Sequence, residues 1–184
     1  MNREQWLTEL AKQIEPFFTE TLPPYRVACS WPSKSATSAK NRRIGECWAP
    51  TASEDKTTEM MISMGIDDPL EVASTLVHEM VHAVVGVQHG HKAPFKRCAL
   101  AVGLTGKMTA TKASEELTER LNGLMADMPP YPHARLNASS KKKQGTRMLK
   151  AVCECGYTVR LAKKWADVGA PICPQYNVSM EMVS

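Results

Sequence analysis

The stretch Leu76-Val77-His78-Glu79-Met80-Val81-His82-Ala83-Val84-Val85 decides the fold of the chain, because it predicts a buried helix that carries polar groups. Residues four apart on an α-helix share a face, so His78 and His82 can offer imidazole nitrogens to one metal ion. Glu79 follows the first histidine, where its carboxylate can reach a water on that metal. Burying these three groups among apolar residues without a shared partner would be costly. The pattern therefore indicates a zinc site suited to hydrolysing a peptide bond.

This helix has a clear start and an apolar circumference. Asp68 is placed to accept a hydrogen bond as the N-cap, Pro69 fits the first helical position, and Glu71 fits the third. Gly86 is a residue at which the helix can end. Apolar residues wrap most of the surface, so we expect the helix to be buried. They are Leu70, Val72, Ala73, Leu76, Val77, Met80, Val81, Val84 and Val85.

A third protein ligand is expected, because catalytic zinc commonly takes three and leaves its fourth position to water. The segment 88–95 follows the helix and holds two histidines, His89 and His91, which compete for this role on spacing alone. Glu115 and Glu116 are weaker alternatives, since acidic residues also suit the first turn of a helix.

The flanking sequence predicts an α+β domain over residues 1–135. Its expected elements are an amphipathic helix in the first twenty residues interrupted at Pro16, strands at 25–31, 44–49 and 57–64, a short helix ending near Val102, a connection at 104–111 and a helix at 113–128. The polar, basic loop at 32–43 is either solvated or a phosphate contact.

Two motifs together resemble the SprT-like metalloprotease family, which includes the Spartan proteases. They are His78-Glu79-Met80-Val81-His82 and Gly90-His91-Lys92-Ala93-Pro94-Phe95. The second is similar to the family's Gly-His-Gly-x-x-Phe, with Lys92 in place of the second glycine. The resemblance implies a small zincin-like domain with helices packed on a short three-stranded sheet, and it selects His91 over His89 as third ligand. It also implies a protease that degrades proteins attached to DNA.

The C-terminal portion resembles the zinc ribbon that follows many SprT-like domains. We expect a basic linker at 136–147 and a ribbon-like β module at 148–184, with strands at 148–152 and 158–161. Cys153, Cys155 and Cys173 are candidate ligands, but no Cys or His stands near Gln175 to complete the four that a structural zinc site needs. The module can bind zinc through three thiolates plus water or a distant residue, fold without metal, or stay loose. We favour a ribbon-like fold with weakened zinc binding.

Charge is distributed unevenly along the chain. Between Arg135 and Lys164, nine basic side chains accompany one acidic side chain, although the whole chain has a net charge of only +4. This concentration suggests an anionic partner, and DNA is the leading candidate. The alternative is a solvated linker that only confers solubility. The candidate nucleic-acid contacts are Lys141, Lys142, Lys143, Arg147 and Lys150.

The composition is that of a globular protein without a membrane span, at 43% hydrophobic and 23% charged residues. The first residues are polar and lack a signal-peptide core, so we expect a cytoplasmic protein whose six cysteines are thiols or metal ligands. A monomer is the favoured assembly.

Three functions fit the sequence. The first is a zinc endopeptidase in which His78, His82 and His91 hold the catalytic ion and Glu79 is the general base. The second is a non-enzymatic, zinc-containing factor associated with nucleic acid or transcription, with every zinc position filled by protein. The third is a zinc hydrolase acting on a small amide, because the motif specifies the attack but not the substrate.

Overall fold

The computed structural model describes residues 1–38, 40–137 and 148–183. The chain divides into two compact units, Met1–Ser140 and Lys141–Ser184, and the division falls within the linker predicted at 136–147. Both helices and small sheets are present, which confirms the α+β class. None of the described helices is both long and apolar enough to cross a membrane.

The first unit begins with helix α1, Arg3–Ile14. The Asn2 side chain accepts from the Gln5 N–H and the Gln5 side chain accepts from the Asn2 N–H, which forms a capping box. The helix ends earlier than predicted, because Pro16 falls in a 3-10 turn, Glu15–Phe17, that replaces the last helical turn. The apolar face of α1 is fully buried and contacts β1, α2 and α4.

The main sheet has three strands: β1 Tyr25–Cys29, β2 Gly45–Trp48 and β3 Thr58–Ile62. Their order is β1-β3-β2, with β1 parallel and β2 antiparallel to β3. Alternate residues of the strands point into the core, as a half-buried sheet requires. Strand β2 lies at one edge of the sheet, where it also contacts α2.

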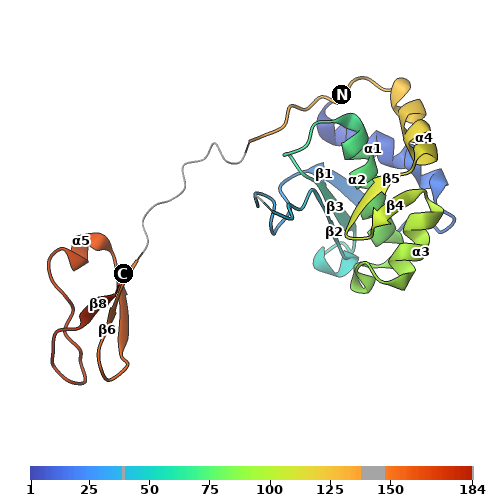
Figure 1. Ribbon diagram of the computed structural model, residues 1–184. Helices are drawn as coiled ribbons and strands as arrows, with labels where there is room; N and C mark the ends of the chain where they lie inside the picture. Colours follow the sequence, from blue (N-terminus) through green and yellow to red (C-terminus); the bar gives the residue numbers. More distant parts are fainter. Residues whose placement is uncertain (39, 138–147, 184) are drawn as a thin grey trace. The chain divides into compact units, whose positions relative to one another are not determined.

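Helix α2, Pro69–Val85, runs through the middle of this unit (Figure 1). The Asp68 carboxylate accepts from the Glu71 N–H at 2.8 Å, and Gly86 ends the helix with a φ of 90°. The start and end predicted from the sequence are therefore confirmed. The helix contacts β2 and β3 on the sheet side and α1, α3 and α4 elsewhere, which accounts for its buried circumference.

The segment after α2 differs from expectation. Helix α3, Ala93–Ala101, is followed by a hairpin of β4, Leu104–Lys107, and β5, Ala110–Ala113. The connection predicted at 104–111 is thus wrong, because backbone pairing forms strands from residues of which only Leu104 is buried. Helix α4, Glu115–Ala126, starts later than predicted since Ala113 belongs to β5 and Ser114 is the N-cap.

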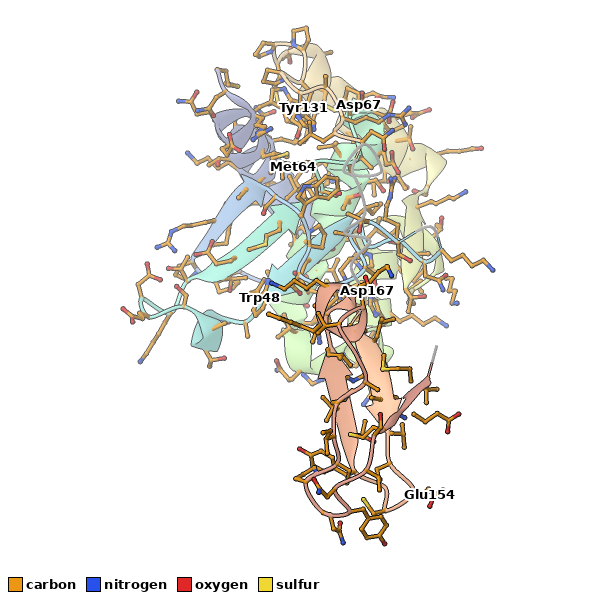
Figure 2. The ribbon with its side chains drawn as sticks, turned by 90° about the vertical axis from the view of Figure 1, so that its left-hand side faces the viewer. Trp48, Met64, Asp67, Tyr131, Glu154 and Asp167 are labelled. Atoms are coloured by element: carbon orange, nitrogen blue, oxygen red, sulfur yellow. The ribbon has the colours of Figure 1, made fainter. Side chains whose placement is uncertain are left out.

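The chain then crosses back over the end of the sheet. The Trp6 indole donates to the Pro129 carbonyl at 2.8 Å, and the Leu136 N–H donates to the Met64 carbonyl at 2.7 Å. Figure 2 shows Met64 and Tyr131 at this end of the unit, away from Trp48. These contacts tie segment 129–136 to α1 and to the loop that leads into α2.

The second unit is a small antiparallel sheet with strands β6 Leu149–Val152, β7 Thr158–Leu161 and β8 Glu181–Val183, in the order β7-β6-β8. A short helix, α5 Lys163–Ala166, follows β7. The core consists of Ala151, Cys153, Cys173 and Met180. So small an apolar core stabilises a fold poorly without a metal or another crosslink.

Candidate metal centres

Three histidines converge in the first unit. The Nε2 atom of His91 lies 3.2 Å from Nε2 of His78 and 3.2 Å from Nε2 of His82. The three ligand atoms all lie within 4.8 Å of one another. A tetrahedral zinc with Zn–N distances of about 2.0–2.1 Å would hold its nitrogens roughly 3.3–3.4 Å apart. The group therefore fits a single zinc ion closely, and no fourth His, Cys, Asp or Glu joins it in the described part of the chain.

Local structure explains why His91 belongs to this group and His89 does not. His78 and His82 are one turn apart on α2, and a short 3-10 turn, Val87–His89, follows the helix. Gly90 then takes a φ of 49°, which favours glycine and turns the chain back towards α2. Spacing alone could not choose between the two histidines, whereas this turn places His91 beside the helix.

Phe95 is the packing surface for all three imidazoles. Its ring is fully buried on α3, and its centroid lies 4.8, 4.4 and 4.8 Å from those of His78, His82 and His91. Side chains held against a buried ring lose little further freedom when they bind a metal, so this contact preorganises the group.

The hydrogen-bond partner of His78 comes from the hairpin that the sequence did not predict. Thr111 Oγ1 on β5 lies 2.8 Å from Nδ1 of His78, on the ring nitrogen opposite the one that faces the group. Such a partner fixes the tautomer and orientation of a metal-binding histidine. The role of Thr111 could not be predicted from the sequence, because its position beside His78 depends on the pairing of two short polar strands.

Burial keeps these imidazoles neutral. It lowers the pKa of His78 to about 4, with His91 adding to the effect, and the pKa of His82 to about 3, with His78, His91 and Arg43 adding. Burial and then Arg43 also lower the pKa of His91. Metal ligation requires neutral imidazole, so at neutral pH all three nitrogens are free to bind a cation.

Glu79 is buried between α2 and strand β2. A Cβ atom at Gly45 would overlap its Oε1 and lie 2.7 Å from Cγ2 of Thr75, so the glycine makes room for the carboxyl group. Burial raises the pKa of Glu79 to about 8, Arg43 opposes this shift, and Glu46 adds to it. A divalent cation nearby would favour the carboxylate and so lower this pKa.

Arg43 and Glu46 form a polar network beside this carboxyl group. Arg43 Nη1 lies 2.5 Å from Glu46 Oε1, and Glu46 also accepts from the Ser33 N–H and hydroxyl, each at 2.7 Å. The basic loop at 32–43, predicted to be solvated or to contact phosphate, thus includes one cation that pairs with Glu46 and acts electrostatically on Glu79, His82 and His91. Sequence spacing gave no signal for this arrangement.

We expect Thr111→Val to lower zinc affinity at the histidine group by about 10–100-fold, the usual cost of losing a partner that orients a ligand. The measurement is competition for zinc against a chelator of known affinity. The control is Thr109→Val, since Thr109 is exposed in the turn of the same hairpin. Equal affinities for the two variants would show that Thr111 does not orient His78.

If the histidine group holds a catalytic zinc with Glu79 as its base, Gly45→Ala should reduce hydrolytic activity by about 10–100-fold while zinc stays bound, because displacing a catalytic group by about 1 Å can cost this much. Its matched control is Gly123→Ala in α4, where an added Cβ meets no atom within 4 Å. Activity and bound zinc are measured on the same samples. Undiminished activity in Gly45→Ala would mean that the position of Glu79 tolerates displacement.

A cavity of about 300 Å³ adjoins the histidine group. Its walls include Trp48 and Pro50 from the β2 side and His82 and Val85 from the end of α2. A larger cavity of about 720 Å³ lies between α1 and the segment 19–25 and contains none of the three histidines. Of the three histidines, only His82 lines the smaller cavity.

The second candidate metal centre is a group of three cysteines in the second unit. The sulfurs of Cys153, Cys155 and Cys173 lie within 4.8 Å of one another, and Cys155 Sγ is 3.5 Å from Cys173 Sγ. Tetrahedral zinc with Zn–S distances of about 2.3 Å would separate two sulfurs by roughly 3.8 Å. All three are free thiols, so the group fits a thiolate-bound metal.

The remaining candidates lie elsewhere. Lys141, Lys142, Lys143 and Arg147 fall outside the described residues, whereas Lys150 lies on β6 opposite Arg160 of β7. Glu115 and Glu116 stand in the first turn of α4, and the structure does not place them in the histidine group.

No family model, curated protein or solved structure matches this chain.

Proposed function

We propose that the chain is a zinc-dependent endopeptidase of the SprT-like type, with a zincin-like catalytic domain and a zinc-ribbon-like C-terminal module. One observation carries the proposal: three neutral imidazoles converge on a point beside a buried glutamate, with no fourth protein ligand in the described residues. A structural zinc site usually has four protein ligands, whereas a catalytic site keeps one position open. The geometry thus favours an enzyme over a zinc-stabilised binding factor.

His78, His82 and His91 would hold the catalytic zinc. When bound, zinc lowers the pKa of a water from near 16 towards roughly 7 and polarises a substrate carbonyl. Glu79 takes the proton from the attacking water and later donates it to the leaving amine, so the peptide bond breaks while the new carboxyl group forms.

The surroundings of the site support a peptide substrate. Edge strand β2 runs beside α2, with Gly45 against Glu79 and Trp48 lining the 300 Å³ cavity next to His82. An unpaired strand edge offers backbone groups to an extended peptide, and the cavity can take one of its side chains. A small amide would use neither feature.

We further propose that the substrates are proteins associated with DNA. The basic residues between Arg135 and Lys164 support this, because a tether to DNA raises the local concentration of proteins bound to the same DNA. Phosphate contacts also make binding dependent on salt.

The test is cleavage of an unfolded, DNA-binding protein by the zinc-loaded chain, with new N-termini identified by mass spectrometry. Chelation should abolish cleavage and zinc should restore it. DNA should accelerate cleavage, and replacing Lys141, Lys142 and Lys143 with glutamine should remove only that acceleration. Absence of cleavage by the zinc-loaded chain, with or without DNA, would contradict the peptidase, whereas cleavage that DNA leaves unchanged would contradict only the DNA role.

A further inference from the structure

The cysteines of the second unit stand on two turns built in the same way. In the first turn, the Cys153 N–H donates to the Tyr157 carbonyl at 3.0 Å, and the Gly156 N–H donates to the Cys153 carbonyl at 2.8 Å. In the second turn, the Cys173 N–H donates to the Val178 carbonyl and the Asn177 N–H to the Cys173 carbonyl, both at 2.8 Å.

The backbone conformation extends this correspondence. Gly156 has a φ of 87° and Asn177 a φ of 54°, so each turn closes on a residue in the left-handed region. Glycine and asparagine are the residues that adopt this conformation most readily. Cys153 therefore corresponds to Cys173, and Gly156 corresponds to Asn177, with one more residue in the second turn.

This correspondence shows where a fourth ligand would stand. In the first turn the residue just before the left-handed position is Cys155, which belongs to the cysteine group. In the second turn the residue in that place is Tyr176. Its side chain is 54% exposed, and its hydroxyl lies farther from the Cα atom than a cysteine sulfur does. Tyr176 thus occupies, in the second turn, the place that Cys155 holds in the first.

The turns are nevertheless arranged for a thiolate-bound metal. The backbone N–H groups of Gln175 and Tyr176 are directed at the sulfur of Cys173, and Cys155 Sγ lies 3.5 Å from the same sulfur. Backbone N–H groups directed at sulfur favour the thiolate, the form that binds metals. Glu154, the residue after Cys153 in the first turn, points away from the strands of this unit (Figure 2), and it is not in the group.

We propose that Cys153, Cys155 and Cys173 form a three-thiolate metal site whose fourth coordination position, beside Tyr176, is open to a soft ligand from outside the turns. The ligand class is a thiolate or an imidazole, the donors that borderline-soft Zn²⁺ prefers. Because the core of this unit is small, whatever fills the position also stabilises its fold. The site does not depend on peptidase activity, so either proposal can fail without the other.

The test uses the full chain loaded with two equivalents of ¹¹³Cd²⁺, whose NMR shift separates thiolate-bound from nitrogen-bound ions. We expect the thiolate-bound signal of the wild-type chain to shift when 2-mercaptoethanol or imidazole is added. Tyr176→Cys should give a signal typical of four thiolates that neither compound moves, and should raise zinc affinity, because a fourth thiolate then binds the ion. Tyr176→Phe should respond like the wild type.

Three results would overturn the proposal. A wild-type signal that neither compound moves would mean that the fourth position is already filled by the chain. A response that appears in Tyr176→Phe but is absent from the wild type would assign that position to the Tyr176 hydroxyl. Absence of any thiolate-bound signal from the wild-type chain would mean that three cysteines are too few to hold the ion.

Discussion

Glu79→Gln is expected to lower peptide-bond cleavage by about 10²–10⁴-fold, the usual contribution of a general acid–base group, while leaving the affinity for zinc unchanged. Glutamine keeps the size of the side chain, so the close packing against Gly45 and Thr75 is retained. It cannot accept the proton of the attacking water or return one to the leaving amine. The variant thus separates proton transfer from metal binding.

The control for this prediction is Glu71→Gln, which removes an exposed carboxyl group from the first turn of the same helix. Cleavage rates and bound zinc are measured for both variants and the wild type. Undiminished cleavage by zinc-loaded Glu79→Gln would remove Glu79 from the mechanism, whereas equal losses in both variants would point to a general effect on α2.

His91→Ala is expected to lower zinc affinity at the histidine group by more than about 100-fold, since removing a partner that merely orients a ligand already costs about 10–100-fold. The chain should then retain one zinc fewer than the wild type after equilibration with a competing chelator, and cleavage should be lost. The physical reason is that two imidazoles on one helix face cannot enclose the ion.

His89→Ala provides the matched control, because His89 lies two residues away on the 3-10 turn and outside the group. It should keep the wild-type zinc content and activity. The opposite outcome, with His89→Ala losing zinc and His91→Ala keeping it, would reverse the ligand assignment. Loss in both variants would indicate that the turn needs both histidines to fold.

The sequence predicted the elements that have strong local signals. Both ends of α2 are predicted correctly, from the Asp68 cap, the apolar circumference of the helix and the glycine at position 86. The three strands of the main sheet also lie where expected, within a few residues. The elements that were missed include the β4–β5 hairpin, strand β8 and the four-residue helix α5. The missed strands are short and mostly exposed, so they depend on pairing rather than on hydrophobic periodicity.

The residues of the candidate site divide in the same way, into those that a local pattern predicts and those that only tertiary contacts place. Helical spacing was enough to place His78 beside His82, since both are on one element. The contacts of Thr111 and Gly45, and the electrostatic effect of Arg43 on Glu79, join parts of the chain far apart in sequence, so no local pattern could reveal them. His91 is intermediate, because its position depends on the left-handed turn at Gly90.

The coordination of zinc in the metal-loaded chain is the most direct test of the central claim, that the histidine group is an open catalytic site. Anomalous diffraction at the zinc edge would locate the ion and its ligands. The account predicts zinc bound by Nε2 of His78, His82 and His91, with solvent rather than a protein atom in the fourth position. A fourth protein ligand on this ion, or zinc bound without His91, would contradict it.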